Sequence, residues 1–257
     1  QHKGSLNDVW TSTDGRSWTV INGDGNGVSW SARDGHTAIY DESSGAIFVI
    51  GGADSDDGAM MVLNDIWRSW DKGRTWELIC DTPGWSGRWK HASAFHRGSL
   101  YVIGGYGDHG YGNDVWSSDD GVAWERLTTD AQFPPRAMHT LVVHQGILYV
   151  IGGFGGHECL NDVWASVSGQ RWTRVCHSAP WLPRHSHVAV SHGEFMYVMG
   201  GDGPNATLND VWKSRDGALW ELVTIEAVWS PRLKHAAVVH DDLLYVIGGM
   251  DSEQSDT

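Results

Sequence analysis

The sequence has few of the features that mark membrane, nucleic-acid-binding or disulfide-rich proteins. No apolar run approaches the ~18 residues that a membrane-spanning helix needs. Lysine and arginine total 18 against 32 acidic residues, so the formal net charge is -14. Because like charges repel, this balance argues against general binding of nucleic acid or of an anionic lipid surface. We therefore expect neither nucleic-acid binding nor direct membrane insertion.

Cysteine is scarce, and the three cysteines are irregularly spaced. Cys80, Cys159 and Cys176 form neither an even disulfide framework nor a Cys-x-x-Cys metal pair. We interpret them as free thiols, and we expect no metal and no other cofactor. The sequence leaves the compartment open, with secretion favoured over the cytoplasm. The first residue, Gln1, fits either a removed leader or a trimmed chain, and Asn205-Ala206-Thr207 is a glycosylation sequon that matters only after secretion.

Amphipathic runs of helical period and useful length are also missing, which excludes helical solenoids. Two residue types are abundant instead: 16 Trp stand against 5 Phe, and there are 33 Gly. This imbalance indicates a small structural unit that is used repeatedly. Glycine pairs follow apolar runs five times, and the last four pairs are spaced 48 residues apart: Gly51-Gly52, Gly104-Gly105, Gly152-Gly153, Gly200-Gly201 and Gly248-Gly249. A second marker, Leu-Asn-Asp-Val-Trp or a close variant, also recurs five times, with its Trp at Trp10, Trp67, Trp116, Trp164 and Trp212.

Each full unit predicts four short antiparallel strands, which we name a to d. Strand a follows Arg-x-x-His, and strand b ends in the glycine pair. Strand c carries Asn-Asp-Val-Trp, and strand d carries a second Trp after a turn that is usually Asp-Gly. Four-stranded units with a period of 40 to 50 residues are typical of β-propeller blades, because a single sheet cannot bury both of its faces.

The two ends of the chain predict how the ring closes. The chain opens with strands c and d alone and ends with strands a and b alone. Pairing these halves would remove the free strand edges of a linear array. We therefore predict a single all-β domain over residues 1–257, a five-bladed propeller closed by its termini. Its blades are expected at residues 229–250 plus 5–22, 31–80, 87–128, 135–176 and 183–224.

These motifs resemble the kelch family. The sequence "PRAMHTLVVHQGILYVIGG" followed by "LNDVWASVSGQRW" is similar to a kelch blade almost position for position, and the likeness covers nearly the whole chain. Kelch propellers more often have six or seven blades, so five blades suggest part of a longer chain. The resemblance implies a binding module, although the family also includes copper oxidases, a sugar mutarotase and iron-using plant specifier proteins. "SWDKGRTW" resembles the Asp-box turn of sialidases, which is structural in both families.

Several motifs that look functional are better explained by the repeat. "GYGDHG", residues 105–110, matches a dinucleotide fingerprint, but a strand follows it where phosphate binding needs a helix N-terminus. One His per blade and one Asp per blade recur at equivalent positions, so we expect each to serve its own blade. The histidines are His36, His91, His139, His187 and His235, and the aspartates are Asp8, Asp65, Asp114, Asp162 and Asp210.

The candidate binding surface is the face that carries the d–a and b–c loops. Five arginines stand three residues before the histidines, and Trp stands three residues before four of those arginines. Guanidinium groups bind carboxylates with two parallel hydrogen bonds. The alternatives are that each Arg pairs with an acid of the propeller and that each Trp packs between blades. The predicted ligand-binding residues are Arg33, Arg88, Arg136, Arg184, Arg232, Trp30, Trp85, Trp181, Trp229, His109 and His157.

The function predicted from the sequence is non-enzymatic recognition of an acidic peptide or an acidic glycan on this face. The b–c loops differ most between blades and would carry the specificity: residues 53–62, 106–112, 154–159 and 202–207. Two alternatives stay open, a structural subunit of a larger complex and a kelch-type enzyme such as a copper oxidase or a sugar mutarotase.

Overall fold

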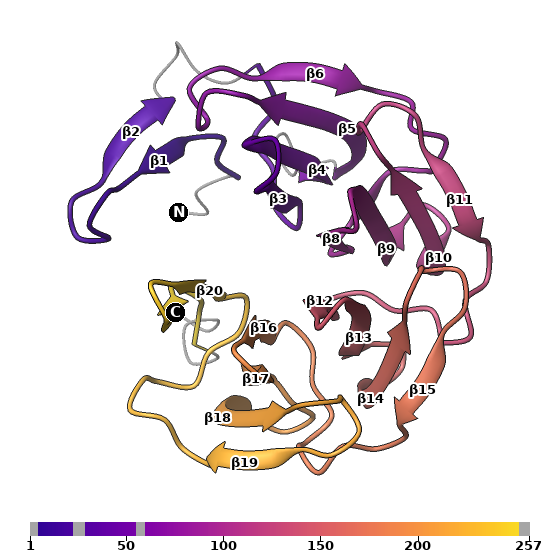
Figure 1. The fold of residues 1–257 in the computed structure, drawn as a ribbon, viewed down its shortest axis with the longest axis vertical. Coiled ribbons are helices and arrows are strands. Elements are labelled where there is room, and N and C mark those ends of the chain that lie inside the picture. The colour runs from indigo at the N-terminus through magenta and orange to yellow at the C-terminus, as the bar shows by residue number, and fades with distance from the viewer. Residues whose placement is uncertain (1–4, 23–28, 55–59, 252–257) are drawn as a thin grey trace.

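The structure is a computed structural model that describes residues 5–22, 29–54 and 60–251. Over these residues the chain forms 21 β-strands and no helix. The sheets stand side by side around a common axis, as the blades of a propeller do (Figure 1). The predicted all-β propeller arrangement is therefore confirmed.

Four blades are complete, and each places its strands in the predicted order a-b-c-d from the axis outward (Figure 1). Blade 1 contains β3 (Thr37–Asp41), β4 (Ala46–Asp54), β5 (Met61–Ser69) and β6 (Glu77–Cys80). Blade 2 contains β7 (Arg88–Trp89), β8 (Ala92–His96), β9 (Ser99–Gly107), β10 (Gly110–Ser118) and β11 (Glu125–Thr128). Blade 3 contains β12 (Thr140–His144), β13 (Ile147–Phe154), β14 (Cys159–Ser166) and β15 (Thr173–Cys176). Blade 4 contains β16 (Val188–His192), β17 (Phe195–Asp202), β18 (Thr207–Ser214) and β19 (Glu221–Thr224).

The predicted fifth blade does not form. The N-terminal hairpin of β1 (Val9–Thr11) and β2 (Thr19–Asn22) is one two-stranded sheet, and the C-terminal hairpin of β20 (Ala236–His240) and β21 (Leu243–Ile247) is another. The hairpins face each other across an opening in the ring (Figure 1). The prediction of five blades closed by paired termini was therefore wrong. Four complete blades and two separate half blades take its place.

The physical reason for the open ring lies between the blades. Large side chains fill each interface, as Trp85 does between Phe48 of blade 1 and Leu100 of blade 2. Such packing sets the angle through which each blade turns from its neighbour. With the blades packed in this way, the β1–β2 and β20–β21 hairpins do not pair with each other and stay separate sheets.

The hydrophobic core is divided among the interfaces between neighbouring blades. One cluster joins Ile103 and Val115 of blade 2 to Leu148, Val150 and Trp164 of blade 3, and all five are buried. Strand b is covered on both faces, which explains why its sequence is a continuous apolar run rather than an alternating one. The repeated apolar runs therefore serve packing from blade to blade.

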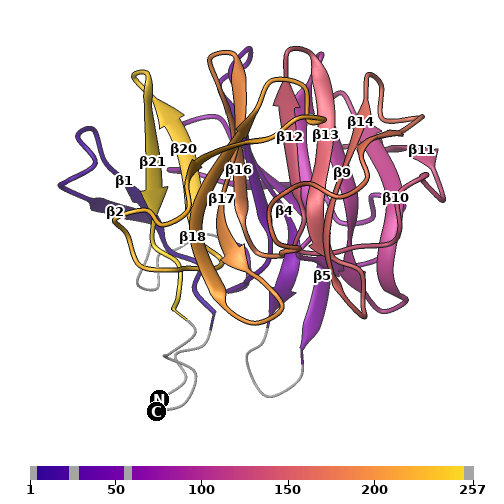
Figure 2. The same ribbon diagram turned by 90° about the horizontal axis from the view of Figure 1, so that it is seen from below.

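Strand direction places the d–a and b–c loops on one face of the propeller, because neighbouring strands run antiparallel. Figure 2 shows the strands running between the two faces, with β4 and β5 approaching each other at the lower one. Part of the first b–c loop, residues 55–59, lies outside the described residues. No helix in the described part of the chain is long and apolar enough to span a bilayer.

Candidate functional site

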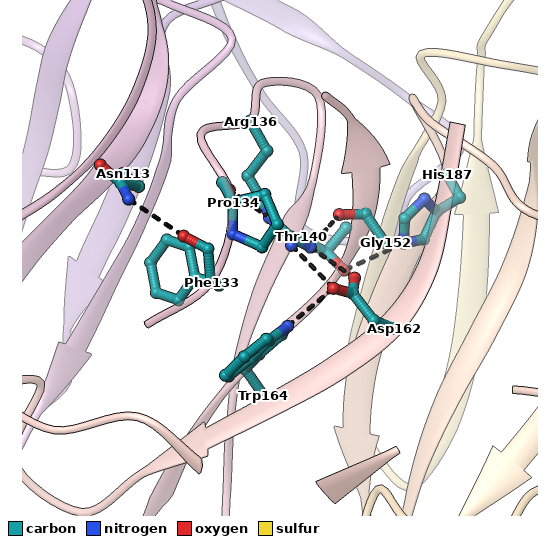
Figure 3. A network of polar contacts seen from close by, with 9 residues as sticks. All are labelled: Asn113, Phe133, Pro134, Arg136, Thr140, Gly152, Asp162, Trp164 and His187. Carbon is teal, nitrogen blue, oxygen red and sulfur yellow. Dashed lines mark hydrogen bonds and ion pairs between the residues drawn. The ribbon is translucent and has the colours of Figure 1, made fainter. Parts of the chain in front are cut away.

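The arginine that precedes strand a is held by the aspartate of strand c in the same blade. In blade 3, Arg136 Nη1 and Nη2 donate to the Oδ1 and Oδ2 of Asp162 at 2.7 and 2.9 Å (Figure 3). Arg136 Nη1 also donates to the carbonyl oxygen of Gly152 at 2.9 Å, and Trp164 Nε1 donates to Asp162 Oδ2 at 2.7 Å. Arg136 is fully buried, so this clamp ties the start of strand a to strands b and c.

The same clamp recurs in every complete blade, and its arginine is buried each time. The four pairs are Arg33–Asp65, Arg88–Asp114, Arg136–Asp162 and Arg184–Asp210. The half blades show what happens without a partner strand. Arg232 is partly exposed and donates to Gly248 and Ser230, while Asp8 is exposed and accepts from Trp10. The clamp therefore forms only where strands a and c belong to one sheet.

The clamp also sets the ionisation of its aspartate. Burial alone would raise the pKa of Asp162, but the hydrogen bonds and positive charge of Arg136, together with Trp164, outweigh burial and lower it. Burial and Arg88 act in the same way on the pKa of Asp114. Both carboxylates are thus charged partners of a buried guanidinium at neutral pH.

The other predicted site residues fall into a buried group and an exposed group. Trp30, Trp85 and Trp181 are buried, as is Phe133 at the equivalent position of blade 3. Trp229, which precedes the C-terminal hairpin, is only partly buried, and His109 and His157 are exposed on b–c loops. The arrangement of the buried arginines and tryptophans agrees with pairing and packing inside the propeller. Ligand binding by the predicted residues stays a prediction.

The glycine pair is required because the neighbouring chain approaches it closely. A Cβ on Gly153 would lie 2.6 Å from the Cβ of His139, and a Cβ on Gly152 would lie 3.1 Å from the carbonyl oxygen of Arg184. Both glycines have positive φ, which is +54° at Gly152 and +102° at Gly153. The pair thus lets strand b pass against its own strand a and against the next blade.

The repeated histidines line the central channel and are held neutral. Burial, followed by the charge of the nearby arginine, lowers the pKa of His91 and of His139 to about 3, and that of His235 to about 4. Some of them have a hydrogen-bond partner, such as His187 Nε2 with Thr140 Oγ1 at 3.2 Å (Figure 3). Both ring nitrogens of His139 lack a partner among the described residues. The prediction that each His serves its own blade was therefore wrong, because the described bonds of His187 and His91 join them to Thr140 and Thr37 of the preceding blades.

These histidines predict a loss of stability in mild acid. A His whose pKa is lower in the folded state than its ordinary value of 6.5 binds its proton first in the unfolded chain. Its contribution is complete above about pH 6.5 and falls as the pH decreases toward the folded pKa. We expect the urea midpoint to fall between about pH 7 and about pH 5. His139→Gln should reduce that slope, whereas exposed His109→Gln should leave it unchanged, and equal slopes in all three proteins would contradict the assignment.

Backbone hydrogen bonds join successive blades around the channel mouth. The residue immediately before each repeated His has a positive φ of 53° to 60°, and we call these five residues the inner ring. Its members are Gly35, Lys90, Met138, Ser186 and Lys234. Each amide donates to the carbonyl oxygen of the preceding member, with distances of 2.7, 2.9, 3.0 and 2.9 Å from Lys90 to Lys234. The inner-ring side chains therefore differ on a backbone that is the same in every blade.

The inner ring and the histidines surround a hollow of about 180 Å³ on the face of the d–a and b–c loops. Lys90 and Lys234 contribute its cations, and neither forms an ion pair with a described carboxylate. Burial, and then the charge of Lys234, lowers the pKa of Lys90. The ammonium of Lys90 also lies 3.7 Å from the ring centroid of Trp89. The channel mouth thus has two lysines without an ion pair to a described carboxylate, and the charge of Asp34 only partly opposes the lowering of the Lys90 pKa.

The sequence contains a signal for the inner ring in the residue that precedes each repeated His. Within Arg-x-x-His, the Arg and His are constant, whereas the residue before His is Gly, Lys, Met, Ser or Lys in successive repeats. Constant neighbours indicate a shared backbone, and a variable position between them is where specificity differs. The predicted ligand-binding residues included the constant arginines but neither Lys90 nor Lys234.

The four-stranded blades, the glycine pairs and the Arg–Asp clamps together define a kelch-type β-propeller. The chain belongs to the family described as the KLHDC2/KLHL20/DRC7 Kelch-repeats domain, whose model matches residues 1–179 and again residues 122–257. No curated protein matches the chain. A kelch propeller of this type is a protein-binding scaffold, and such domains are typically non-enzymatic. Over the described residues, no group of three or more His, Cys, Asp or Glu is arranged to hold a metal ion.

Proposed function

We propose that this propeller binds an acidic segment of a partner protein at the channel mouth, on the face of the d–a and b–c loops. The observation that carries the proposal is that Lys90 and Lys234 both line the hollow of the inner ring and neither forms an ion pair with a described carboxylate. A carboxylate between two ammonium groups would relieve their repulsion. The partner is a protein because the family is a protein-binding one.

The backbone of the inner ring supports side-chain recognition. Its amides from Lys90 to Lys234 already donate to neighbouring carbonyl oxygens, so they are not free for a ligand. The buried arginines are similarly occupied by their aspartates. Recognition of the acidic segment therefore depends on Lys90 and Lys234, with partly exposed Arg232 and Trp229 beside the C-terminal hairpin.

Charge reversal of the two lysines tests the proposal. A fluorescein-labelled octaglutamate peptide serves as the probe, and its fluorescence anisotropy reports binding at low salt. We expect Lys90→Glu/Lys234→Glu to weaken binding about tenfold or more, which corresponds to ~1.4 kcal/mol, because attraction becomes repulsion. Binding should also weaken as salt is added.

A matched variant separates the site from net charge. Lys72→Glu/Arg97→Glu makes the same charge change in turns of the opposite face and should leave the affinity within about twofold of wild type. Equal weakening by both pairs would mean that the peptide responds only to overall charge, and an unchanged affinity of the lysine pair would refute the site. Arg136→Ala/Arg184→Ala is a poor test, because it leaves two buried aspartates unpaired.

A further inference from the structure

Blade 2 differs from the other repeats at two positions of the same face. Gly112 stands where the other four copies of the strand c marker have Leu6, Leu63, Leu160 and Leu208. Gly87 stands before the clamp arginine, where the other repeats have Ala32, Pro135, Pro183 and Pro231. Blade 2 therefore lacks two side chains that every other repeat has.

The leucine side chain covers the b–c loop in other blades. A Cβ on Gly155 would lie 3.5 Å from Leu160 Cδ1 in blade 3, and a Cβ on Gly203 would lie 3.4 Å from Leu208 Cδ1 in blade 4. Gly112 offers no such cover to the loop of blade 2. Its φ is not in the left-handed region, so glycine is not required there for backbone reasons.

A pocket of about 270 Å³ lies beside Gly112, where the leucine side chain is missing. A Cβ on Gly87 would instead lie 2.4 Å from the carbonyl oxygen of Val62, so this glycine lets the chain pass close to blade 1. Gly87 and Gly112 line it together with the Arg88–Asp114 clamp, and Arg126 and His109 also contribute. Arg126 is exposed and lies 5.4 Å from the ring centroid of Trp116, without an ion pair to a described carboxylate. Since Asp114 neutralises Arg88, the guanidinium of Arg126 is the uncompensated charge on the wall.

The guanidinium of Arg88 has one N–H donor that the clamp does not use. Arg88 Nε donates to Ser86, Nη1 donates to Gly104 and Asp114, and Nη2 donates to Asp114 once. A guanidinium has five N–H groups, so one N–H of Nη2 has no described acceptor. The hydroxyl groups of Ser86 and Thr129 also line the pocket. The lining thus combines space for an aliphatic chain with donors for an anion.

We infer that this blade 2 pocket binds one glutamate side chain of the acidic partner segment. The methylene groups of the glutamate occupy the space that leucine fills in the other blades, and its carboxylate pairs with Arg126. The inference rests on the proposed function, because it adds a second anchor for the same segment. Arg88 lines the pocket and Lys90 lines the channel hollow, two residues along the chain. Two residues of any conformation span at most ~7 Å of chain, so one peptide reaches both.

Filling the pocket with the leucine of the other repeats tests the inference. Gly112→Leu restores the common residue, and the Asp114 carboxylate, which a Cβ would approach to 2.9 Å, coexists with leucine in blades 1, 3 and 4. The affinity for octaglutamate, measured by fluorescence anisotropy, should fall about threefold or more in Gly112→Leu and in Arg126→Gln. A change of this size is within the range of one exposed charge pair. Arg174→Gln is the matched control, because Arg174 lies 5.5 Å from the Trp164 ring beside the leucine of blade 3. Its affinity should stay at the wild-type value.

The outcomes separate this inference from the proposed function. If Lys90→Glu/Lys234→Glu weakens binding while Gly112→Leu does not, the channel mouth stands and the blade 2 pocket is refuted. If neither change affects binding, both are refuted. Octaglutamine binding as tightly as octaglutamate would show that charge is not recognised. Thermal unfolding of each variant confirms that it folds, and a Gly112→Leu protein that melts well below wild type leaves Arg126→Gln against Arg174→Gln as the deciding comparison.

Discussion

Asp162→Ala should destabilise the propeller by about 3–5 kcal/mol, because it leaves the guanidinium of Arg136 buried without its counter-ion. The Arg136 side chain has no access to water, and both of its Nη atoms donate to the Asp162 carboxylate. Water therefore cannot replace the lost carboxylate. Urea unfolding at neutral pH measures the change. The unfolding midpoint should fall, with the slope against urea concentration preserved if the four blades unfold together.

Asp8→Ala is the matched control for this result. Asp8 occupies the same position of the repeat, but it is exposed and contacts Trp10 without an arginine. Its loss should cost less than about 1 kcal/mol, as for most surface positions. A second variant, Arg136→Met/Asp162→Leu, removes both charges and should recover much of the loss. Equal effects of Asp162→Ala and Asp8→Ala would show that the clamp adds nothing to stability.

Acid should weaken the clamp in a lower pH range than the histidines. The pKa of Asp162 is below its ordinary value of 3.8, so its contribution is present above that pH and is lost as the pH falls through the folded pKa. The histidine contribution starts to fall from about pH 6.5. Stability should therefore decline in two stages, of which only the second becomes smaller in Arg136→Met/Asp162→Leu, because the clamps of the other blades remain.

Gly153→Ala is expected to have the second large effect, a loss of about 3 kcal/mol or more. Its φ of +102° is unfavourable for alanine, and the new Cβ would lie 2.6 Å from His139 Cβ and 2.9 Å from the carbonyl oxygen of Ala137. Neither atom is the end of a flexible side chain, so strand a must move. Thermal and urea unfolding measure the loss.

Gly98→Ala separates the two causes of that effect. Gly98 lies in an a–b turn with a φ of +85° and has no atom within 4 Å of an added Cβ. It therefore reports backbone strain alone, at about 1 kcal/mol. If Gly153→Ala costs no more than Gly98→Ala, close packing against His139 is not the reason for the glycine pair.

The sequence was sufficient for the blade itself. The apolar run of strand b, the Asp-Gly turns and the strand c marker are local patterns, and each predicts strands and turns from a few adjacent residues. The family resemblance rests on these same repeated residues and is confirmed. Repetition strengthened the prediction, because five copies of a weak local signal agree.

The candidate site was only partly predictable. The repeat correctly indicated which face carries the variable loops, and Gly112 in place of leucine is visible in the alignment of the repeats. The burial of Arg136 and the position of Lys90 at the channel hollow were not visible, because both depend on how strands from different repeats pack. A constant arginine and a variable lysine look equally available in a linear sequence.

The sequence by itself determined the fold of each blade and the kelch family of this protein, since hydrogen-bonded neighbours in a blade are close along the chain. Only the tertiary structure decided that the ring stays open, that four arginines are buried in clamps, and that Lys90 and Lys234 share one hollow. The angle between blades depends on the packing of large side chains from different repeats. No single repeat contains that information, so the number of blades in a closed ring cannot be counted from repeats alone.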